Sequence, residues 1–175
     1  IRSNAKAAVA SLYKSGVEHV VMLSGDNQKT ASVISSQVGI EKAFGDLLPE
    51  DKVTRIEALV RDYKNVAMIG DGINDAPALA KSSVGISMGM AGTDTAMETA
   101  DVALMRDDLE QVAVAITQGK RALSVIKFNI AFAIAIKVVF LVLAVSGHTN
   151  LWFAVAADTG ASLLVILNAL RLLRV

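Results

Sequence analysis

The chain has 175 residues with 17 basic and 17 acidic side chains, so its formal net charge is zero. That balance argues against a nucleic-acid partner, which usually requires a basic excess. The absence of cysteine excludes a disulfide framework within this chain. Hydrophobic residues make up 53% of the sequence, too many for a disordered chain and more than an ordinary soluble domain contains.

The charged residues are concentrated in the first 127 positions. Beyond them the sequence has only Lys137, Asp158, Arg171 and Arg174. We therefore divide the chain into a charged region over 1–120, which is long enough to bury a core, and an apolar region over 121–175.

Strands and helices alternate through the charged region. Apolar residues at helical spacing predict a helix over 4–15, which Gly16 ends. Short apolar runs predict buried strands over 19–23 and 65–69. The other predicted elements are helices over 28–38, 49–63 and 75–81, strands near 43–44 and over 84–88 and 102–104, and a helix from Leu109 onward. This alternation predicts an α/β fold with a mainly parallel sheet.

Two long apolar segments make up the second region. Residues 128–145 and 151–167 are each nearly free of charge, and about 20 such residues cross a bilayer as a helix. We predict a transmembrane hairpin with helices over about 125–146 and 151–172. Basic residues flank its outer ends and are missing from its turn: Lys120, Arg121, Lys127, Arg171 and Arg174. The positive-inside rule then places the α/β region in the cytoplasm. The alternative is a buried helical hairpin of a soluble protein.

Polar, glycine-rich loops follow two of the predicted strands, at the edge where parallel sheets gather their working residues. Ser24 offers a hydroxyl, and the backbone amides near Gly25 could hold a phosphate. Asp71 and Asp75 are hard oxygen ligands of the kind that Mg²⁺ prefers, and Lys52 is a cation that could neutralise a phosphoryl oxygen. Together these groups predict phosphoryl-transfer chemistry. Each motif alone could instead be a turn, a helix cap or a solvated surface residue.

Lys137 and Asp158 are ionisable residues within the predicted spans, where such residues usually serve function. Counting along the helices places them at similar depth. A carboxylate can ligate a divalent cation and a nearby ammonium can compete with it, which suits a site that binds and then releases. A purely structural ion pair is the alternative. For Asn129 and Asn168 we expect interhelical hydrogen bonds, and for His148 an exposed position in the turn without a metal role.

Three motifs resemble, in order and spacing, the phosphorylation domain of P-type ATPases, which has a haloacid-dehalogenase-like, Rossmann-like fold. They are Ser24-Gly25-Asp26-Asn27, Leu48-Pro49-Glu50-Asp51-Lys52 and the string GDGINDAPAL over 70–79. The resemblance implies that the Ser24-Gly25-Asp26 loop bonds the phosphoryl group, with Ser24 where the family usually has Thr. It also implies that Lys52 holds the phosphate.

The same resemblance assigns roles to the third motif. Asp71 would ligate Mg²⁺, and Asp75 would support that metal site and hydrolysis of the aspartyl phosphate. Asn74 would help to hold the loop. ATP, the implied substrate, would be bound mainly by a nucleotide-binding domain that these 175 residues do not include.

The apolar region resembles the last two helices of the zinc/cadmium/lead subgroup of heavy-metal P-type ATPases. The likeness lies in Lys137, in Asp158-Thr159-Gly160 and in the run over 168–172. It implies that Asp158 is a ligand of the transported Zn²⁺, Cd²⁺ or Pb²⁺ and that Lys137 is its counter-ion. It also implies a multi-pass protein of the cell (plasma or inner) membrane, with divalent heavy-metal ions and the lipid bilayer as partners.

The sequence departs from the family in lacking the DKTG motif with its nucleophilic aspartate. The nucleotide-binding domain, the actuator domain and the earlier membrane helices are also missing. We therefore expect a C-terminal part of a metal-exporting pump, with the missing N-terminal part as its partner, and no phosphoenzyme from these residues alone. A membrane-anchored phosphatase is a second interpretation, although no aspartate precedes Ser24. A non-catalytic membrane or regulatory module derived from such a pump is a third.

Overall fold

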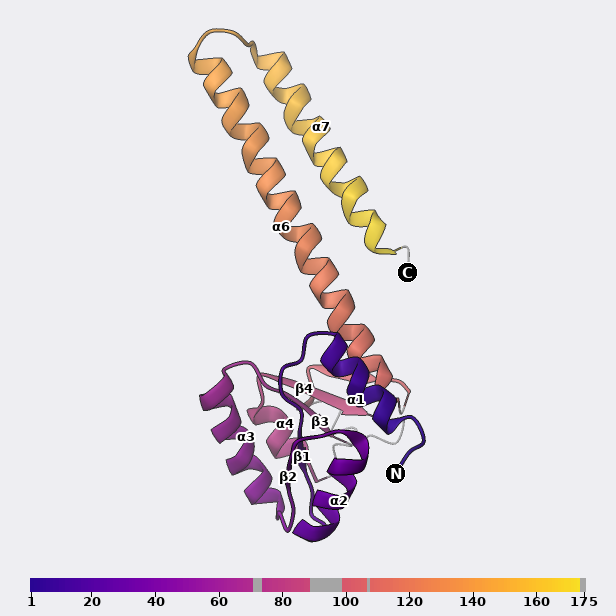
Figure 1. The fold of residues 1–175 in the computed structure, drawn as a ribbon. Coiled ribbons are helices and arrows are strands. Elements are labelled where there is room, and N and C mark those ends of the chain that lie inside the picture. Colours follow the sequence, from indigo (N-terminus) through magenta and orange to yellow (C-terminus); the bar gives the residue numbers. More distant parts are fainter. Residues whose placement is uncertain (71–73, 89–98, 107, 174–175) are drawn as a thin grey trace. The chain divides into compact units, whose positions relative to one another are not determined.

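The computed structural model describes residues 1–70, 74–88, 99–106 and 108–173. It divides into two compact units, Ile1–Ala115 and Ile116–Val175, and Figure 1 labels most of their elements. Asp71, one of the predicted site residues, lies outside the described residues.

Helices and strands alternate through the first unit as the sequence predicts. Its elements are α1 (Ala5–Lys14), β1 (Val21–Leu23), α2 (Gln28–Val38), β2 (Lys42–Phe44), α3 (Pro49–Tyr63), β3 (Ala67–Gly70), α4 (Ala76–Lys81), β4 (Val84–Met88), β5 (Val102–Leu104) and the start of α6 (Glu110–Val145). The bounds of α2, α3, β4 and β5 are those predicted. The remaining elements begin or end within two residues of their predicted bounds.

Local capping chemistry explains why the helix bounds were predictable. The side chain of Asn27 accepts a hydrogen bond from the backbone N–H of Thr30 at 2.9 Å, which caps α2. Gly39 ends that helix in the left-handed conformation, with φ of 84°. Pro49 occupies the first turn of α3, and the Asp51 carboxylate accepts from the backbone N–H of Leu48 at 3.0 Å.

The strands form two parallel sheets where the sequence predicted one. In the first sheet β1 pairs with β2, and in the second the order is β3-β4-β5. The prediction that the runs over 19–23 and 65–69 are buried strands was wrong in its burial: β1 is half-buried throughout, and in β3 only Met68 is buried. Each of these strands lies at the edge of its sheet, so one side of its backbone has no strand neighbour among the described residues.

One hydrophobic core joins the two sheets. Ile56 from α3, Met68 from β3 and two residues of α4 form a buried cluster, against which Leu23 of β1 packs. The members of the cluster are Ile56, Met68, Ala78 and Leu79, and the partly buried residues around it are Leu23, Val53, Leu59, Val60 and Val66. This core holds the carboxyl end of β3 beside α3 and α4, where the predicted site residues lie.

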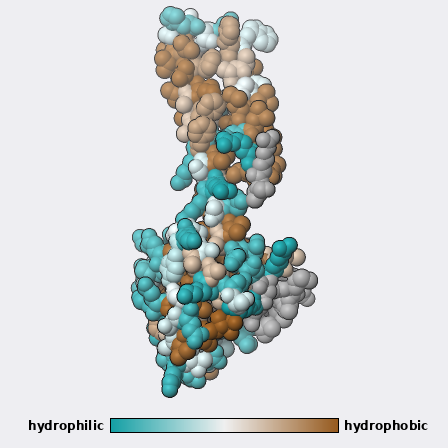
Figure 2. Space-filling view, turned by 45° about the vertical axis from the view of Figure 1, so that its right-hand side comes forward, coloured by the Kyte–Doolittle hydropathy of each residue, from teal (hydrophilic) through white to brown (hydrophobic). Residues whose placement is uncertain are grey.

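The second unit is a helical hairpin made by the rest of α6, by α7 (Leu151–Leu170) and by a short 3₁₀ turn, η1 (Arg171–Leu173). Both long helices are apolar enough and long enough to cross a membrane. Their large hydrophobic side chains are mostly exposed, and the visible face of the hairpin is predominantly hydrophobic (Figure 2). The fold is therefore an α/β unit with parallel sheets followed by a hairpin of the transmembrane type.

Candidate functional site

Ser24 lies immediately after β1 and belongs to a tightly hydrogen-bonded loop. Its hydroxyl donates to Asp26 Oδ2 at 3.2 Å and accepts from the backbone N–H of Asp26 at 3.1 Å. Its own backbone N–H donates to the carbonyl of Phe44 at 2.9 Å, which continues the β1–β2 ladder by one residue. The loop thus places the hydroxyl of the half-buried Ser24 at the carboxyl end of a parallel strand.

Lys52 and Asp75 are brought together from motifs that are 23 residues apart in the sequence. The Lys52 Nζ donates to Asp75 Oδ1 at 2.7 Å, and the two side chains are only 17% and 15% exposed. A charge-assisted hydrogen bond of this length in a partly dehydrated setting is among the stronger polar contacts in proteins. It joins the first turn of α3 to the residue that precedes α4.

Gly70 makes this arrangement possible at the end of β3. A Cβ on Gly70 would lie 2.8 Å from Asp75 Oδ2 and 2.9 Å from Asp75 Cβ, closer than such atoms can approach. Asp75 therefore lies directly against the backbone at the carboxyl end of β3. The absence of a side chain at Gly70 is a steric requirement of the Lys52–Asp75 contact.

The third predicted motif is only partly visible. Asp71 lies outside the described residues, and Asn74 is exposed in the turn before α4. No group of three His, Cys, Asp or Glu side chains suited to a metal occurs within the described ranges. Asp75 supplies carboxylate oxygens of the type that Mg²⁺ prefers, and Oδ2 is the one that Lys52 does not engage. The described residues thus offer Mg²⁺ one carboxylate oxygen at the end of β3 that Lys52 does not engage.

Sequence reasoning missed the residues that join the Ser24 loop to the segment before Lys52. Gln28 bridges them: its Oε1 accepts from the Gly45 N–H at 2.6 Å, and its Nε2 donates to the Ala43 carbonyl at 3.0 Å. The Gln28 N–H donates to Asp46 Oδ2 at 2.9 Å, and the Asp46 N–H donates to the Asp26 carbonyl at 2.6 Å. The dipeptide Gly45-Asp46 after a strand is a turn signal that could have located this junction.

Gly45 and Asp46 show how closely the two loops approach each other. A Cβ on Gly45 would lie 2.5 Å from the Cα of Gln28, so only glycine fits there. Asp46 has a φ of 54°, an uncommon conformation for a residue with a side chain. These contacts fix the Ser24 loop relative to the start of α3 and hence to Lys52.

The hairpin brings together the two ionisable residues that lie within its apolar segments. Lys137 Nζ of α6 lies 3.7 Å from Asp158 Oδ1 of α7, and the side chains are 71% and 63% exposed. Lys137 and Asp158 therefore lie at similar levels along the hairpin, as counting residues predicted. The expected interhelical bond is present as well, because Asn168 Nδ2 donates to Asn129 Oδ1 at 2.8 Å.

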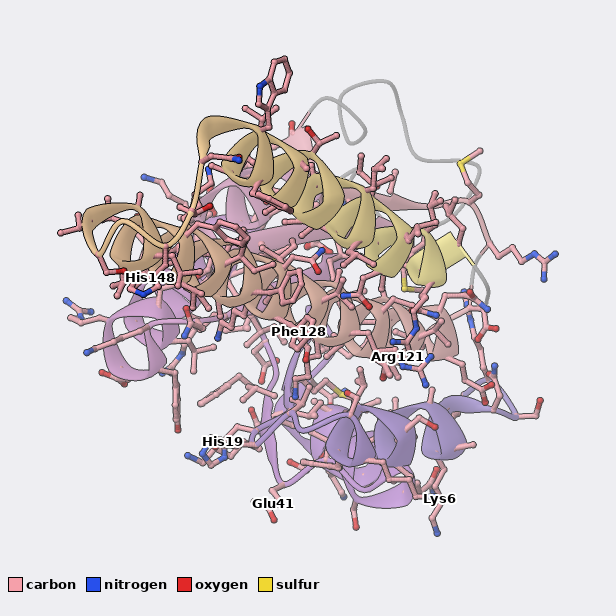
Figure 3. The ribbon with its side chains drawn as sticks, turned by 90° about the horizontal axis from the view of Figure 1, so that it is seen from above. Lys6, His19, Glu41, Arg121, Phe128 and His148 are labelled. Carbon is pink, nitrogen blue, oxygen red and sulfur yellow. The ribbon has the colours of Figure 1, made fainter. Side chains whose placement is uncertain are left out.

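His148 lies in the turn between α6 and α7 and is exposed, as Figure 3 shows together with Arg121 and Phe128 on α6. Its backbone N–H donates to the Leu143 carbonyl at 2.9 Å, which closes the end of α6. The exposed position expected for His148 is confirmed.

Comparisons with known proteins agree with this architecture. The family model of haloacid dehalogenase-like hydrolases matches residues 1–82. A cadmium-transporting ATPase of Staphylococcus aureus is 50% identical over all 175 residues, which correspond to 24% of that protein. A zinc/cadmium/lead-transporting P-type ATPase of Escherichia coli K12 is 45% identical over 99% of this chain and 23% of its own length.

A solved structure gives the same result in three dimensions. The crystal structure of a zinc-transporting PIB-type ATPase in the E2.Pi state superimposes with a TM-score of 0.91 and 44% sequence identity, covering 99% of this chain and 28% of that one. The fold expected from the sequence, a haloacid-dehalogenase-like α/β part followed by a membrane hairpin, is confirmed. The chain spans about a quarter of the length of the curated relatives it matches.

Proposed function

Because its likeness over the whole sequence identifies this chain as part of a heavy-metal P-type ATPase, we propose that it forms part of an ATP-driven pump that exports Zn²⁺, Cd²⁺ or Pb²⁺. The observation that carries the proposal is the 2.7 Å contact between Lys52 and Asp75. It joins two motifs that phosphoryl transfer requires, one after β2 and one after β3, near the carboxyl ends of strands from the two parallel sheets.

In this proposal the α/β unit holds the phosphoryl group. The Ser24 hydroxyl would exchange its bond to the Asp26 carboxylate for one to a phosphoryl oxygen, and the Gly25 backbone amide would add a further donor. Lys52 would neutralise charge on the transferring group, an effect that grows where water is excluded. Its low exposure supports that role.

The third motif would serve the metal that accompanies ATP. Asp71 would ligate Mg²⁺, Asp75 would support the same site, and Asn74 would help to hold the loop. When bound, Mg²⁺ supplies positive charge to the phosphoryl oxygens. The short contact between Asp75 and Lys52 ties the metal-binding loop to the residue that holds the phosphate.

The nucleophile would come from the part of the pump that this chain does not span. The sequence contains no DKTG motif, and the chain covers about a quarter of its relatives. The open edges of β1 and β3 are consistent with a further strand, since both lie at the ends of their sheets among the described residues. The missing N-terminal part would thus complete the phosphorylation domain and supply the nucleotide-binding domain.

The hairpin would supply part of the transport site. Asp158 would ligate the transported cation, and Lys137, 3.7 Å away, would compete with that cation and favour its release. Basic residues at the open end of the hairpin and their absence from its turn favour a cytoplasmic α/β unit in a multi-pass protein of the cell membrane.

The test is to replace Asp158 with Ala in the complete protein that carries this chain. We expect Zn²⁺- or Cd²⁺-stimulated ATP hydrolysis to fall to the level measured without metal, because a metal ligand is lost. Glu57→Ala is the matched control: it also removes a carboxylate, from an exposed pair with Lys81 in the α/β unit, and should leave stimulation unchanged. Undiminished stimulation in Asp158→Ala would remove Asp158 from the transport site.

A further inference from the structure

The hairpin has a second polar contact between its helices besides the Lys137–Asp158 pair. Asn168 Nδ2 donates to Asn129 Oδ1 at 2.8 Å, and Asn129 Nδ2 donates to the Val165 carbonyl at 3.3 Å. Arg171 Nη1 donates to Asn168 Oδ1 at 3.3 Å. These bonds form one directed chain that ends on the backbone of α7. We call Asn129, Asn168 and Arg171 the amide clamp.

The amide clamp and the ion pair lie at two matched depths of the hairpin. Lys137 is 8 residues before the end of α6, and Asp158 is 7 residues after the start of α7. The corresponding separations are 16 residues for Asn129 and 17 for Asn168. At a rise of about 1.5 Å per residue, the ion pair lies about 11 Å and the clamp about 25 Å from the turn. The turn therefore ties one end of the hairpin, the clamp ties the other, and the ion pair lies between them.

On the α7 side, the apolar packing between the helices does little to select one rotation of the helices. The less exposed positions of α7 near the ion pair are small residues: Ala154, Ala157, Gly160 and Ala161. Small residues let helices approach closely, but they offer few side-chain features that would distinguish one rotation from another. Lys137 and Asp158 each follow a less exposed residue, Ile136 or Ala157, by one position. Because neighbouring helical positions differ by about 100°, a modest rotation of either helix would separate them.

We propose that the amide clamp fixes the spacing and rotation of α6 and α7 at the open end of the hairpin, and that it thereby positions Lys137 opposite Asp158. Asn129 and Asn168 are positioning residues that act through the ion pair and do not touch the transported metal. The effect on metal binding rests on the proposed function, whereas the effect on hairpin geometry does not.

In a membrane, the surroundings of the clamp would make the loss of one of its hydrogen bonds costly. Hydrocarbon offers no hydrogen-bonding partner, so an amide that loses its partner there keeps the full cost of its dehydration. Removing one partner of a hydrogen bond is therefore more costly than replacing both by apolar groups. Asn129→Leu leaves the Asn168 amide without its acceptor on α6. The double replacement Asn129→Leu/Asn168→Leu leaves an apolar contact between the helices and removes the acceptor of Arg171, an exposed residue at the end of α7. The double variant thus separates loss of stability from loss of positioning.

The first measurement is the geometry of the hairpin in lipid vesicles. The chain has no cysteine, so cysteines introduced at the exposed positions Leu123 and Leu173 carry the only spin labels, across the open end. A second pair at Leu141 and Val155, also exposed, reports on the region near the turn. We expect Asn129→Leu to broaden the distance distribution of the first pair and to leave the second unchanged. Unchanged distances across the open end would overturn the proposal.

The second measurement is Cd²⁺ binding by the complete protein that carries the chain. Residues that orient a metal ligand typically contribute about 10- to 100-fold to affinity, so we expect at least about tenfold weaker binding in Asn129→Leu. The double variant should regain thermal stability relative to Asn129→Leu and still bind Cd²⁺ weakly. Recovery of affinity together with stability would show a purely structural role and overturn the positioning. Ile130→Leu, which places the same side chain on the neighbouring exposed position, should change neither measurement.

Failure of the clamp is distinguishable from failure of the proposed function. If Asp158→Ala also leaves Cd²⁺ affinity unchanged, the metal site lies elsewhere and the proposed transport role fails. The spin-label distances still decide whether Asn129 and Asn168 hold the open end of the hairpin, because they require no metal.

Discussion

Each unit of this chain holds a lysine–aspartate pair, and the two pairs have opposite surroundings. Lys52 and Asp75 are 2.7 Å apart, and only 17% and 15% of their side-chain surfaces are exposed. Lys137 and Asp158 are 3.7 Å apart and mostly exposed on the hairpin. The chemical groups are the same, so the difference lies in what surrounds them.

The comparison shows how one chemical pair can serve two purposes. The α/β unit itself shields Lys52 and Asp75 from most of the solvent, so protein packing limits their movement before any substrate binds. The hairpin leaves Lys137 and Asp158 open, so lipid or a further part of the protein must complete their environment. An enclosed pair suits a fixed phosphate-binding site, and an open pair suits an ion that must enter and leave.

The largest effect that would test this comparison is expected for Lys52→Ala. Removing a preorganised cation from a water-poor phosphoryl-transfer site typically lowers the rate by about 10²- to 10³-fold. We expect a loss of that size in phosphoenzyme formation from ATP, measured in the complete protein. Lys81→Ala removes a lysine whose partner Glu57 is 3.4 Å away, with both side chains more than half exposed; it should leave the rate unchanged. A normal rate in Lys52→Ala would show that the enclosed pair is only structural.

The next effect concerns the steric basis of the enclosed pair. In Gly70→Ala the new methyl group would lie 2.8 Å from Asp75 Oδ2, so Asp75 must move and its bond to Lys52 must lengthen. Overpacking of this kind typically costs about 2 kcal/mol, which thermal unfolding of the α/β unit in detergent should detect. Gly119→Ala, inside α6 in the second unit, adds a methyl group with nothing within 4 Å of its Cβ; it should leave the melting temperature unchanged or raise it, because alanine is favoured over glycine in a helix. Equal melting temperatures for the two variants would contradict the close approach at Gly70.

Much of the α/β unit could be predicted because its helix boundaries are encoded locally. Asn27, Gly39 and Pro49 carry the capping and stop signals within a few residues of each boundary. The division into two sheets could not be predicted, since an apolar run predicts a strand but does not determine which other strand it pairs with. The contact between Lys52 and Asp75 spans 23 residues, and only the tertiary packing of α3 against α4 determines it.

The hairpin contact could be anticipated more directly. A five-residue connection forces the two helices to run antiparallel, and a constant helical rise converts residue counts into depth. Lys137 and Asp158 therefore had to lie at similar levels. Their orientation toward each other could not be inferred from counting, because rotation about each helix axis depends on contacts such as the one between Asn129 and Asn168.

The smallest effect is expected at the open pair, for Lys137→Met, and it has a direction that a purely structural pair would not produce. If the ammonium competes with the transported cation for Asp158, its removal should raise the affinity for Cd²⁺. We expect about a tenfold increase, equivalent to 1.4 kcal/mol, together with slower metal-stimulated turnover because release is impaired. Lys137→Arg keeps the charge and should retain affinity close to that of the unaltered protein. Weaker binding in Lys137→Met would instead mean that the lysine only holds Asp158 in place, so that the open pair would be structural despite its exposure.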